Sequence, residues 1–430
     1  MQGLIGPLKE LAEFEELCKN KKKDVGMIRV CGCVNSQKSH MMYALGDGCK
    51  YKVIACSSET KAKQIYEEYR FLDSNTYLYP AKDFLFYQAD IRSKELVKQR
   101  MEGIQAVLSG EPVTVVTSLD GFMDHLAPKE SIAEKVLKVQ NDSVLKLDEM
   151  AEKLSVIGYD REVQVEGPGQ FAVRGGILDI YPLTEELPVR IELWGDEVDS
   201  IRTFDVESQR SIENLMDIVI YPAVEFPQNG EKGVSFLDYF PPEDTILFLD
   251  EPVRLVERGQ NIEDEFMEAQ KKRLESGYDL EEEEAKIFPV TEILKKINCY
   301  SSIGFYALGM KCKGLEVRES YEIQAKSVNP YNNSFEMLTQ DLKRLKRNGY
   351  RVILLSGSRT RAKRLAEDLR DYNLSSYYSE DLDREVKPGE IMTAYGYIAE
   401  GYEYPMLKFT VIAESDIFGK RKKKKKRKTY

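Results

Sequence analysis

The sequence has few of the residues that build metal sites, disulfide frameworks or membrane spans. Its 430 residues include one tryptophan, two histidines (His40 and His125) and seven cysteines. The cysteines are odd in number and form no CxxC pair, so we expect neither a disulfide framework nor a zinc site, although Cys31 and Cys33 could in principle bind a metal. No run approaches the roughly 20 apolar residues of a membrane span, and acidic residues stand where a signal peptide is apolar. These absences favour a cytoplasmic protein without a metal.

The chain is acidic except for one basic run. The formal net charge is −11, whereas the segment from Lys420 to Lys428 carries +9, so the remaining residues carry −20. An acidic body repels phosphate backbones, which disfavours DNA binding by the globular part. Because a block of like charges repels itself, we expect residues 419–430 to form a solvated linker or tail, with weak nucleic-acid binding as the alternative.

Length and patterning predict several domains. A chain of 430 residues with 42% hydrophobic and 31% charged residues has a globular composition and is long enough for three or four domains. From residue 26 to about 125, β-rich runs alternate with helical stretches, which is typical of a parallel, doubly wound sheet. Around residue 135 the pattern changes to one helix followed by β-rich runs. After residue 222 the α/β pattern returns, with the strand TILFLDEP and a long charged helix from about Val253 to Ser276.

We therefore predict an α/β fold in which a β-rich α+β domain is inserted into a discontinuous parallel-sheet lobe, and a small α/β domain follows. The predicted boundaries are 1–125 for the first part of the lobe, 126–222 for the insert, 223–328 for the second part of the lobe, 329–418 for the small domain and 419–430 for the basic linker or tail.

The first strand-to-helix junction is similar to a phosphate-binding loop that has lost a glycine. Residues 32–39 (GCVNSQKS) fit the pattern GxxxxGK[ST] with Gly32, Lys38 and Ser39, but Gln37 stands where the second glycine belongs. That glycine lets the loop wrap the phosphates with its amides turned inward. A side chain there strains the loop or fills the phosphate position.

A second similarity to ATPases is the apolar strand that ends in Asp250 and Glu251. In working ATPases this layout holds magnesium, but an ordinary strand followed by a helix N-terminus explains it equally well. We find no convincing motif for the phosphate-sensing arginine that such an enzyme also needs. The sequence therefore predicts a degenerate nucleotide site, with no catalytic residue and no cofactor for this chain.

The β-rich insert presents an unusual aromatic residue. In the run 189–194 (VRIELW), the period of two sends the aliphatic residues to one face and Arg190, Glu192 and Trp194 to the other. Since the aliphatic face must point to the core, the only tryptophan lies on the polar face. Trp and Arg together are typical of protein–protein hot spots, and Arg174 in the preceding AVRGG turn can reach the same surface. The alternative is that Trp194 packs under a loop while the arginines make local ion pairs.

These segments closely resemble the transcription-repair coupling factor family (Mfd), whose second domain is itself similar to a domain of the excision-repair protein UvrB. The most specific matches are GQFAVRGGILDIYP, PVRIELWGDEVDSIRTFD and SQRS in the insert. The flanking blocks YPAKDFLFY, QRMEGIQAVLSGEPVTVVTS, LFLDEP and IAEGYEYPMLKFTVIAESDIFG, with the basic run that follows, also resemble the family. The similarity spans almost the whole chain and is looser from residue 255 to 330.

The resemblance implies a UvrB-like module, in which two parts of a degenerate helicase lobe surround the insert, plus a third small domain. Family members recognise RNA polymerase stalled at DNA damage, displace it with an ATP-driven translocase, and recruit the excision-repair protein UvrA through the insert. Their UvrA contacts fall on Arg174, Arg190 and Trp194, although the family often has Phe at the last position. The polymerase-binding domain and the motor lobes, which use ATP and magnesium on DNA, would lie beyond residue 430.

The leading hypothesis is a non-catalytic, monomeric module that binds UvrA, in which Arg190→Glu weakens binding without unfolding the domain. The alternative is a UvrB-like P-loop ATPase that acts on damaged DNA and binds nucleotide through Lys38. The acidic body and Gln37 argue against it, and residues 80–120 leave too few positions for a DNA-threading β-hairpin. A third possibility is that the insert masks its UvrA surface against a distant part of the full-length protein.

Overall fold

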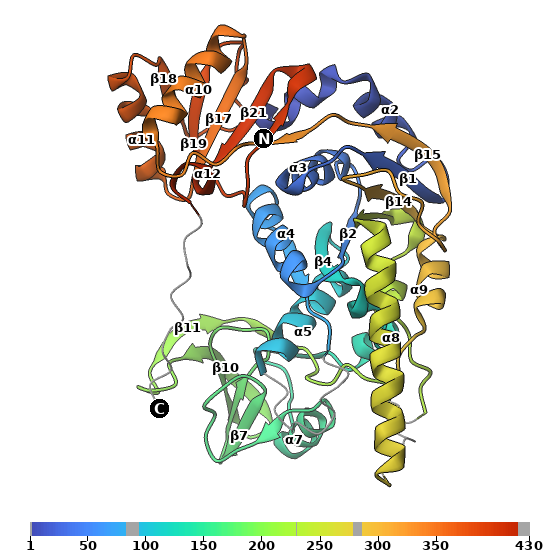
Figure 1. Cartoon of the computed structure of the whole chain (residues 1–430). Helices are drawn as coiled ribbons and strands as arrows, with labels where there is room; N and C mark the ends of the chain where they lie inside the picture. Colours follow the sequence, from blue (N-terminus) through green and yellow to red (C-terminus); the bar gives the residue numbers. More distant parts are fainter. Residues whose placement is uncertain (1, 83–93, 229, 278–285, 420–430) are drawn as a thin grey trace.

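The computed structural model describes residues 2–82, 94–228, 230–277 and 286–419 (Figure 1). The basic run 420–428 and the segment 83–93, which covers part of the region in which a β-hairpin was considered, lie outside the described residues. Figure 1 shows a central lobe, with the β-rich insert at one end and a small α/β unit at the other.

The lobe is built on a seven-stranded sheet in which every ladder is parallel. Its strands, in the order β15-β1-β14-β13-β2-β4-β3, are Val317–Glu322, Gly26–Cys31, Ser301–Phe305, Thr245–Asp250, Tyr51–Cys56, Val113–Ser118 and Thr76–Tyr79. Helices α3 (Asn35–Leu45), α4 (Glu59–Leu72), α5 (Lys94–Leu108) and α8 (Pro252–Glu275) follow strands of this sheet, and α9 (Val290–Ile297) precedes β14. Strands β4 and β13 are buried at every position, which explains the apolar run ILFL of β13.

The strand order shows that the lobe is discontinuous. Strands β13 and β14, which follow the insert in sequence, lie between β1 and β2, which precede it. The chain therefore leaves the lobe, builds the insert, and returns to the middle of the same sheet. The predicted fold class, a parallel lobe with an inserted β-rich unit and a further small α/β unit, is confirmed.

The insert is a largely antiparallel six-stranded sheet. Its strands, in the order β11-β10-β9-β8-β7-β6, are Ser211–Leu215, Glu197–Phe204, Val189–Trp194, Ile177–Tyr181, Gln170–Arg174 and Asp160–Arg161. Buried residues of the inner face, such as Phe171 and Ile191, belong to one core with helix α7 (Leu147–Val156). Strands β5 (Leu137–Gln140) and β12 (Asp217–Ile220) pair antiparallel where the chain enters and leaves the insert.

The third unit (residues 326–418) has a six-stranded sheet in the order β16-β20-β21-β17-β19-β18. These strands are Lys326–Ser327, Tyr402–Tyr404, Phe409–Ala413, Arg351–Ser356, Ile391–Tyr395 and Ser376–Ser379. Helices α10 (Phe335–Arg347), α11 (Arg359–Asp371) and α12 (Glu414–Phe418) complete the unit. The predicted helix, strand, helix, strand and strand are all present, while the short strands β18 and β20 are additional.

A buried ionic cluster lies where the insert joins the lobe. Arg100 of α5 is fully buried, and its Nε donates to Glu225 Oε1 at 2.7 Å while its Nη2 donates to Asp124 Oδ2 at 2.6 Å. Lys82 Nζ lies 3.1 Å from Asp124 Oδ2 and 3.2 Å from Glu225 Oε1. Burial favours the neutral acid, but Arg100 and Lys82 outweigh it and hold the pKa of Glu225 below its usual value. Because Asp124 and Glu225 flank the insert in sequence, the cluster ties both of its connections to α5.

Candidate functional site

The outer face of the insert sheet carries the predicted hot-spot residues. Along β9, Val189 and Ile191 are buried, whereas the Trp194 side chain is 85% exposed. The alternation of the strand therefore places the aromatic ring in solvent, and the ring does not pack under a loop. The ring stands beside Glu192, which forms an ion pair with Arg202 on β10.

A buried carboxylate links the two arginines of this face. Asp179 of β8 is fully buried, and its Oδ1 accepts from Arg190 Nε at 2.7 Å. Its Oδ2 accepts from Arg190 Nη2 at 2.9 Å and from Arg174 Nη2 at 2.7 Å. The register explains the contact, because Asp179 pairs with Ala172 on β7 and with Arg190 on β9. The arginines do make local ion pairs, as the alternative interpretation predicted, but they share one acid.

The two arginines differ in how much of the guanidinium remains available. The Arg190 side chain is 14% exposed, its Nη2 also donates to Gln209 Oε1 at 2.8 Å, and its guanidinium lies 4.4 Å from the centre of the Phe204 ring. The hydrogen bonds to Asp179 raise the pKa of Arg190 further. By contrast, the Arg174 side chain is 46% exposed. Arg174 and Trp194 can therefore meet a partner directly, while Arg190 mainly supports the surface.

Sequence reasoning missed Asp179, and a signal for it existed. In the strand ILDIY the acid stands at an outward position, on the strand next to VRIELW. A charged residue there, flanked by arginines on the neighbouring strand and turn, is the composition of a buried ion pair. A small apolar cluster of Val165, Ala172 and Phe204, also unpredicted, lies on this face beneath Arg190.

The degenerate phosphate motif lies at the start of α3, and its groups are bonded within the protein. Gln37 is the third residue of the helix rather than part of a loop, and its Oε1 accepts from the backbone N–H of Val34 at 3.1 Å. Lys38 is 4% exposed, and its Nζ lies 2.8 Å from Asp250 Oδ1 and 2.6 Å from Glu251 Oε1. Burial lowers the pKa of Lys38, but the two carboxylates outweigh that effect and raise it above the usual value.

Ser39 and Glu251 also form hydrogen bonds within the protein. The Ser39 hydroxyl donates to Glu68 of α4, a carboxylate that is 1% exposed. Glu251 has a left-handed backbone (φ +52°), and its Oε1 also accepts from the backbone N–H of Ala307 at 2.9 Å. A cavity of about 370 Å³ is lined by Lys38, Asp250 and Glu251, with Lys61 and Arg254 also in its wall. The structure thus places Lys38 against Asp250 and Glu251, whereas Gln37 bonds to Val34 and Ser39 bonds to Glu68. Gly32 precedes these groups with a left-handed backbone.

Neither a metal cluster nor a membrane span is found in the described part of the chain. No group of three or more His, Cys, Asp or Glu side chains there could hold a metal ion. Cys31 and Cys33 are buried at the end of β1, and burial raises the pKa of the Cys33 thiol to about 12. Among the described helices, none combines the length and the apolar character needed to cross a membrane.

Comparison with known proteins supports the resemblance on the scale of the whole chain. Residues 137–226 match the family model of the UvrB interaction domain. The transcription-repair-coupling factor of Bacillus subtilis is 26% identical over 98% of this chain and 41% of its own length. That of Staphylococcus haemolyticus is 24% identical over 83% of this chain and 35% of its own length.

A solved structure described as a hypothetical ATP-dependent RNA helicase from Sulfolobus tokodaii aligns over 91% of this chain and 82% of that chain, with 10% identity and a TM-score of 0.26. The chain spans about two fifths of the length of the Bacillus subtilis relative. The chain is therefore similar to transcription-repair-coupling factors over most of its own length, and residues 137–226 match the UvrB interaction domain.

Proposed function

We propose that this chain is a non-catalytic module of a transcription-repair-coupling factor that binds the excision-repair protein UvrA through the outer face of its insert. In the full-length protein this binding recruits UvrA to RNA polymerase stalled at DNA damage. Polymerase binding and ATP-driven movement on DNA belong to domains beyond residue 430. We expect the module to be a cytoplasmic monomer.

The observation that carries the proposal is the exposed Trp194 on the insert sheet that also carries the pre-arranged Arg174. The Trp194 indole is 85% exposed in the free protein, so its apolar surface is in contact with water. Removing that surface from water when a partner covers it is favourable for binding. Arg174 is held by Asp179 and still offers N–H donors to solvent. Since part of its rotamer freedom is already lost, less entropy is lost when a partner carboxylate binds.

The charge of this surface fits an acidic partner. Arg174 and Arg190 share the single carboxylate of Asp179, so the three side chains keep one net positive charge. This charge stands out on a body that carries −20 outside the basic run. It favours approach of a carboxylate group and disfavours wrong orientations of the partner.

We propose that this chain is not catalytic because the side chains of the degenerate motif already have partners within the protein. Lys38 is neutralised by two carboxylates, and Ser39 donates to Glu68 rather than facing the cavity. A nucleotide would have to break these buried contacts before its phosphates could bind, and breaking a buried ion pair costs about 3–5 kcal/mol.

Titration calorimetry of purified UvrA into this chain tests the proposal. Trp194→Ala and Arg174→Ala should each weaken binding, whereas Arg364→Ala, an exposed arginine of the third unit, serves as the matched control. Arg190→Glu is a poor test, because it would place a second carboxylate against the buried Asp179 and destabilise the insert. Equal affinities for the wild type and both insert variants would contradict the proposed surface.

A further inference from the structure

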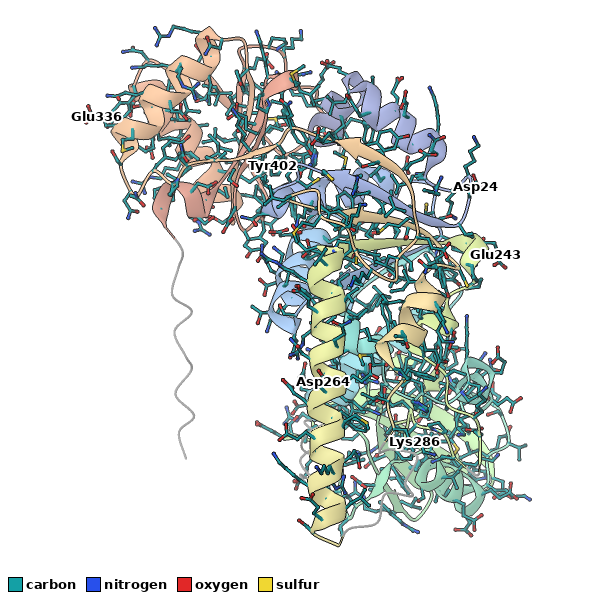
Figure 2. All side chains as sticks on the ribbon, turned by 45° about the vertical axis from the view of Figure 1, so that its right-hand side comes forward. Asp24, Glu243, Asp264, Lys286, Glu336 and Tyr402 are labelled. Atoms are coloured by element: carbon teal, nitrogen blue, oxygen red, sulfur yellow. The ribbon has the colours of Figure 1, made fainter. Side chains whose placement is uncertain are left out.

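We infer that helix α3, which follows the decayed phosphate motif, has become the docking surface for the third unit of this chain. Residues at the positions that serve phosphate binding in a working site now hold the segment from Ile398 to Phe409. Figure 1 shows the third unit next to α3 and the N-terminal helices, and Figure 2 places Tyr402 at this junction, with Glu336 on the far side of the unit.

A chain of hydrogen bonds with defined directions crosses the junction. Gln37 Nε2 donates to the hydroxyl of Tyr404 at 3.1 Å, and that hydroxyl lies 2.9 Å from His40 Nδ1. His40 Nε2 lies 2.9 Å from the carbonyl oxygen of Leu4, which can only accept. Hence Nε2 carries the proton, Nδ1 accepts from Tyr404, and Tyr404 accepts from Gln37. Burial lowers the pKa of His40 to about 4, so the neutral ring that this order requires is present at neutral pH.

Glu68 makes a second set of contacts across the junction. Its Oε1 accepts from the Ser36 hydroxyl at 2.6 Å and from the backbone N–H of Ala399 at 3.0 Å. The backbone N–H of Glu400 donates to the Ser36 hydroxyl at 3.1 Å, and Asn35 donates to the Glu400 carboxylate. Thus a carboxylate of the third unit lies at the first turn of α3, where a working site receives phosphate.

A shared apolar core supports these polar contacts. Met41 and Met42 of α3 belong to one buried cluster with Met392, Tyr402 and Phe409 of the third unit. On the N-terminal side, Arg351 Nη1 also donates to Glu10 Oε1 at 2.6 Å. A unit joined by a continuous core and by buried, satisfied polar groups moves with the lobe as one body.

The hydrogen bond to Tyr404 gives Gln37 a structural role that the sequence motif does not reveal. A glycine at residue 37 would restore the consensus phosphate motif, yet it would remove the donor to Tyr404 and leave Lys38 and Ser39 with their present partners. The glutamine at position 37 therefore both breaks the phosphate motif and supplies a hydrogen bond that docks the third unit. The sequence pattern alone predicts that Gln37→Gly gains nucleotide binding, whereas the docking predicts that it loosens the third unit.

Two variants of the whole chain separate these outcomes. Gln37→Gly is titrated with ATP and magnesium, and amide hydrogen exchange is followed across residues 398–409. Tyr404→Phe, which leaves the phosphate motif intact, is followed in the same way, and Tyr378→Phe is the control because its hydroxyl lies 3.5 Å from Glu380 on the unit itself.

We expect no ATP binding by Gln37→Gly, and exchange in 398–409 faster by on the order of tenfold in both junction variants. The buried Tyr404 hydroxyl loses its donor in Gln37→Gly, and the Gln37 amide loses its acceptor in Tyr404→Phe. Tyr378→Phe should exchange like the wild type. ATP binding by Gln37→Gly with wild-type exchange would overturn the inference. Wild-type exchange in Tyr404→Phe would overturn it as well.

Discussion

Replacing the buried Asp179 by Asn should destabilise the insert and weaken the proposed binding of UvrA. The substitution keeps the shape of the side chain and removes its charge. Hydrogen bonds to charged groups contribute about 1.5–3 kcal/mol, and both bonds from the mostly buried Arg190 depend on this charge. The bond from the half-exposed Arg174 contributes at most about 1 kcal/mol because solvent screens it. Since Asn retains one acceptor, we expect a loss of about 2–3 kcal/mol in the free energy of unfolding.

The effect on affinity follows from the freedom of Arg174. Without its anchor the side chain must be ordered on binding, which costs about 0.5–1.5 kcal/mol and corresponds to roughly two- to tenfold weaker binding. Urea denaturation followed by circular dichroism measures stability, because the exposed Trp194 reports poorly on folding. Calorimetry with UvrA measures affinity. In an Arg174→Ala background, Asp179→Asn should still destabilise the insert but no longer change affinity through Arg174. Unchanged stability in Asp179→Asn would refute the reasoning.

Two further substitutions and one pH dependence follow from the same contacts. Trp194→Ala should weaken UvrA binding by about 2 kcal/mol or more, as hot-spot residues do, and leave urea stability within about 0.5 kcal/mol; unchanged affinity would speak against the surface. Glu225→Gln leaves the buried Arg100 short of a carboxylate and should lower the free energy of unfolding by about 3 kcal/mol, and a loss below about 1 kcal/mol would show that the cluster is not stabilising. The pKa of Glu225 is lowered on folding, so its contribution to the free energy of unfolding is complete above the unfolded-state pKa of about 4.3 and is lost as the pH falls through the folded-state pKa. The difference in the free energy of unfolding between wild type and Glu225→Gln should therefore shrink between pH 7 and pH 3.

Local patterns in the sequence predicted the fold class and the outward position of Trp194. The period of two in 189–194 placed Trp194 on the polar face, and the alternation of β-rich runs with helical stretches predicted a parallel sheet, which includes β4. The motif 32–39 and the acidic pair after β13 meet because both follow parallel strands, and the carboxyl ends of such strands share one edge of the sheet, a contact that the two motifs taken separately did not predict.

The contacts that organise these residues depend on pairings that no local pattern contains. Tyr404 meets Gln37 across 367 positions, and Arg100 meets Glu225 across 125. Periodicity reports which face of an element is buried, but not which distant element covers it. The pattern therefore showed that Gln37 breaks a motif and could not show that Gln37 holds the third unit.

The most direct test of the account is titration of UvrA into the wild-type chain, with ATP and magnesium titrated separately in the same buffer. The account predicts saturable binding of UvrA, which Trp194→Ala weakens, and no binding of ATP. Absence of UvrA binding together with ATP binding that is lost in Lys38→Ala would contradict it and favour a nucleotide-binding enzyme.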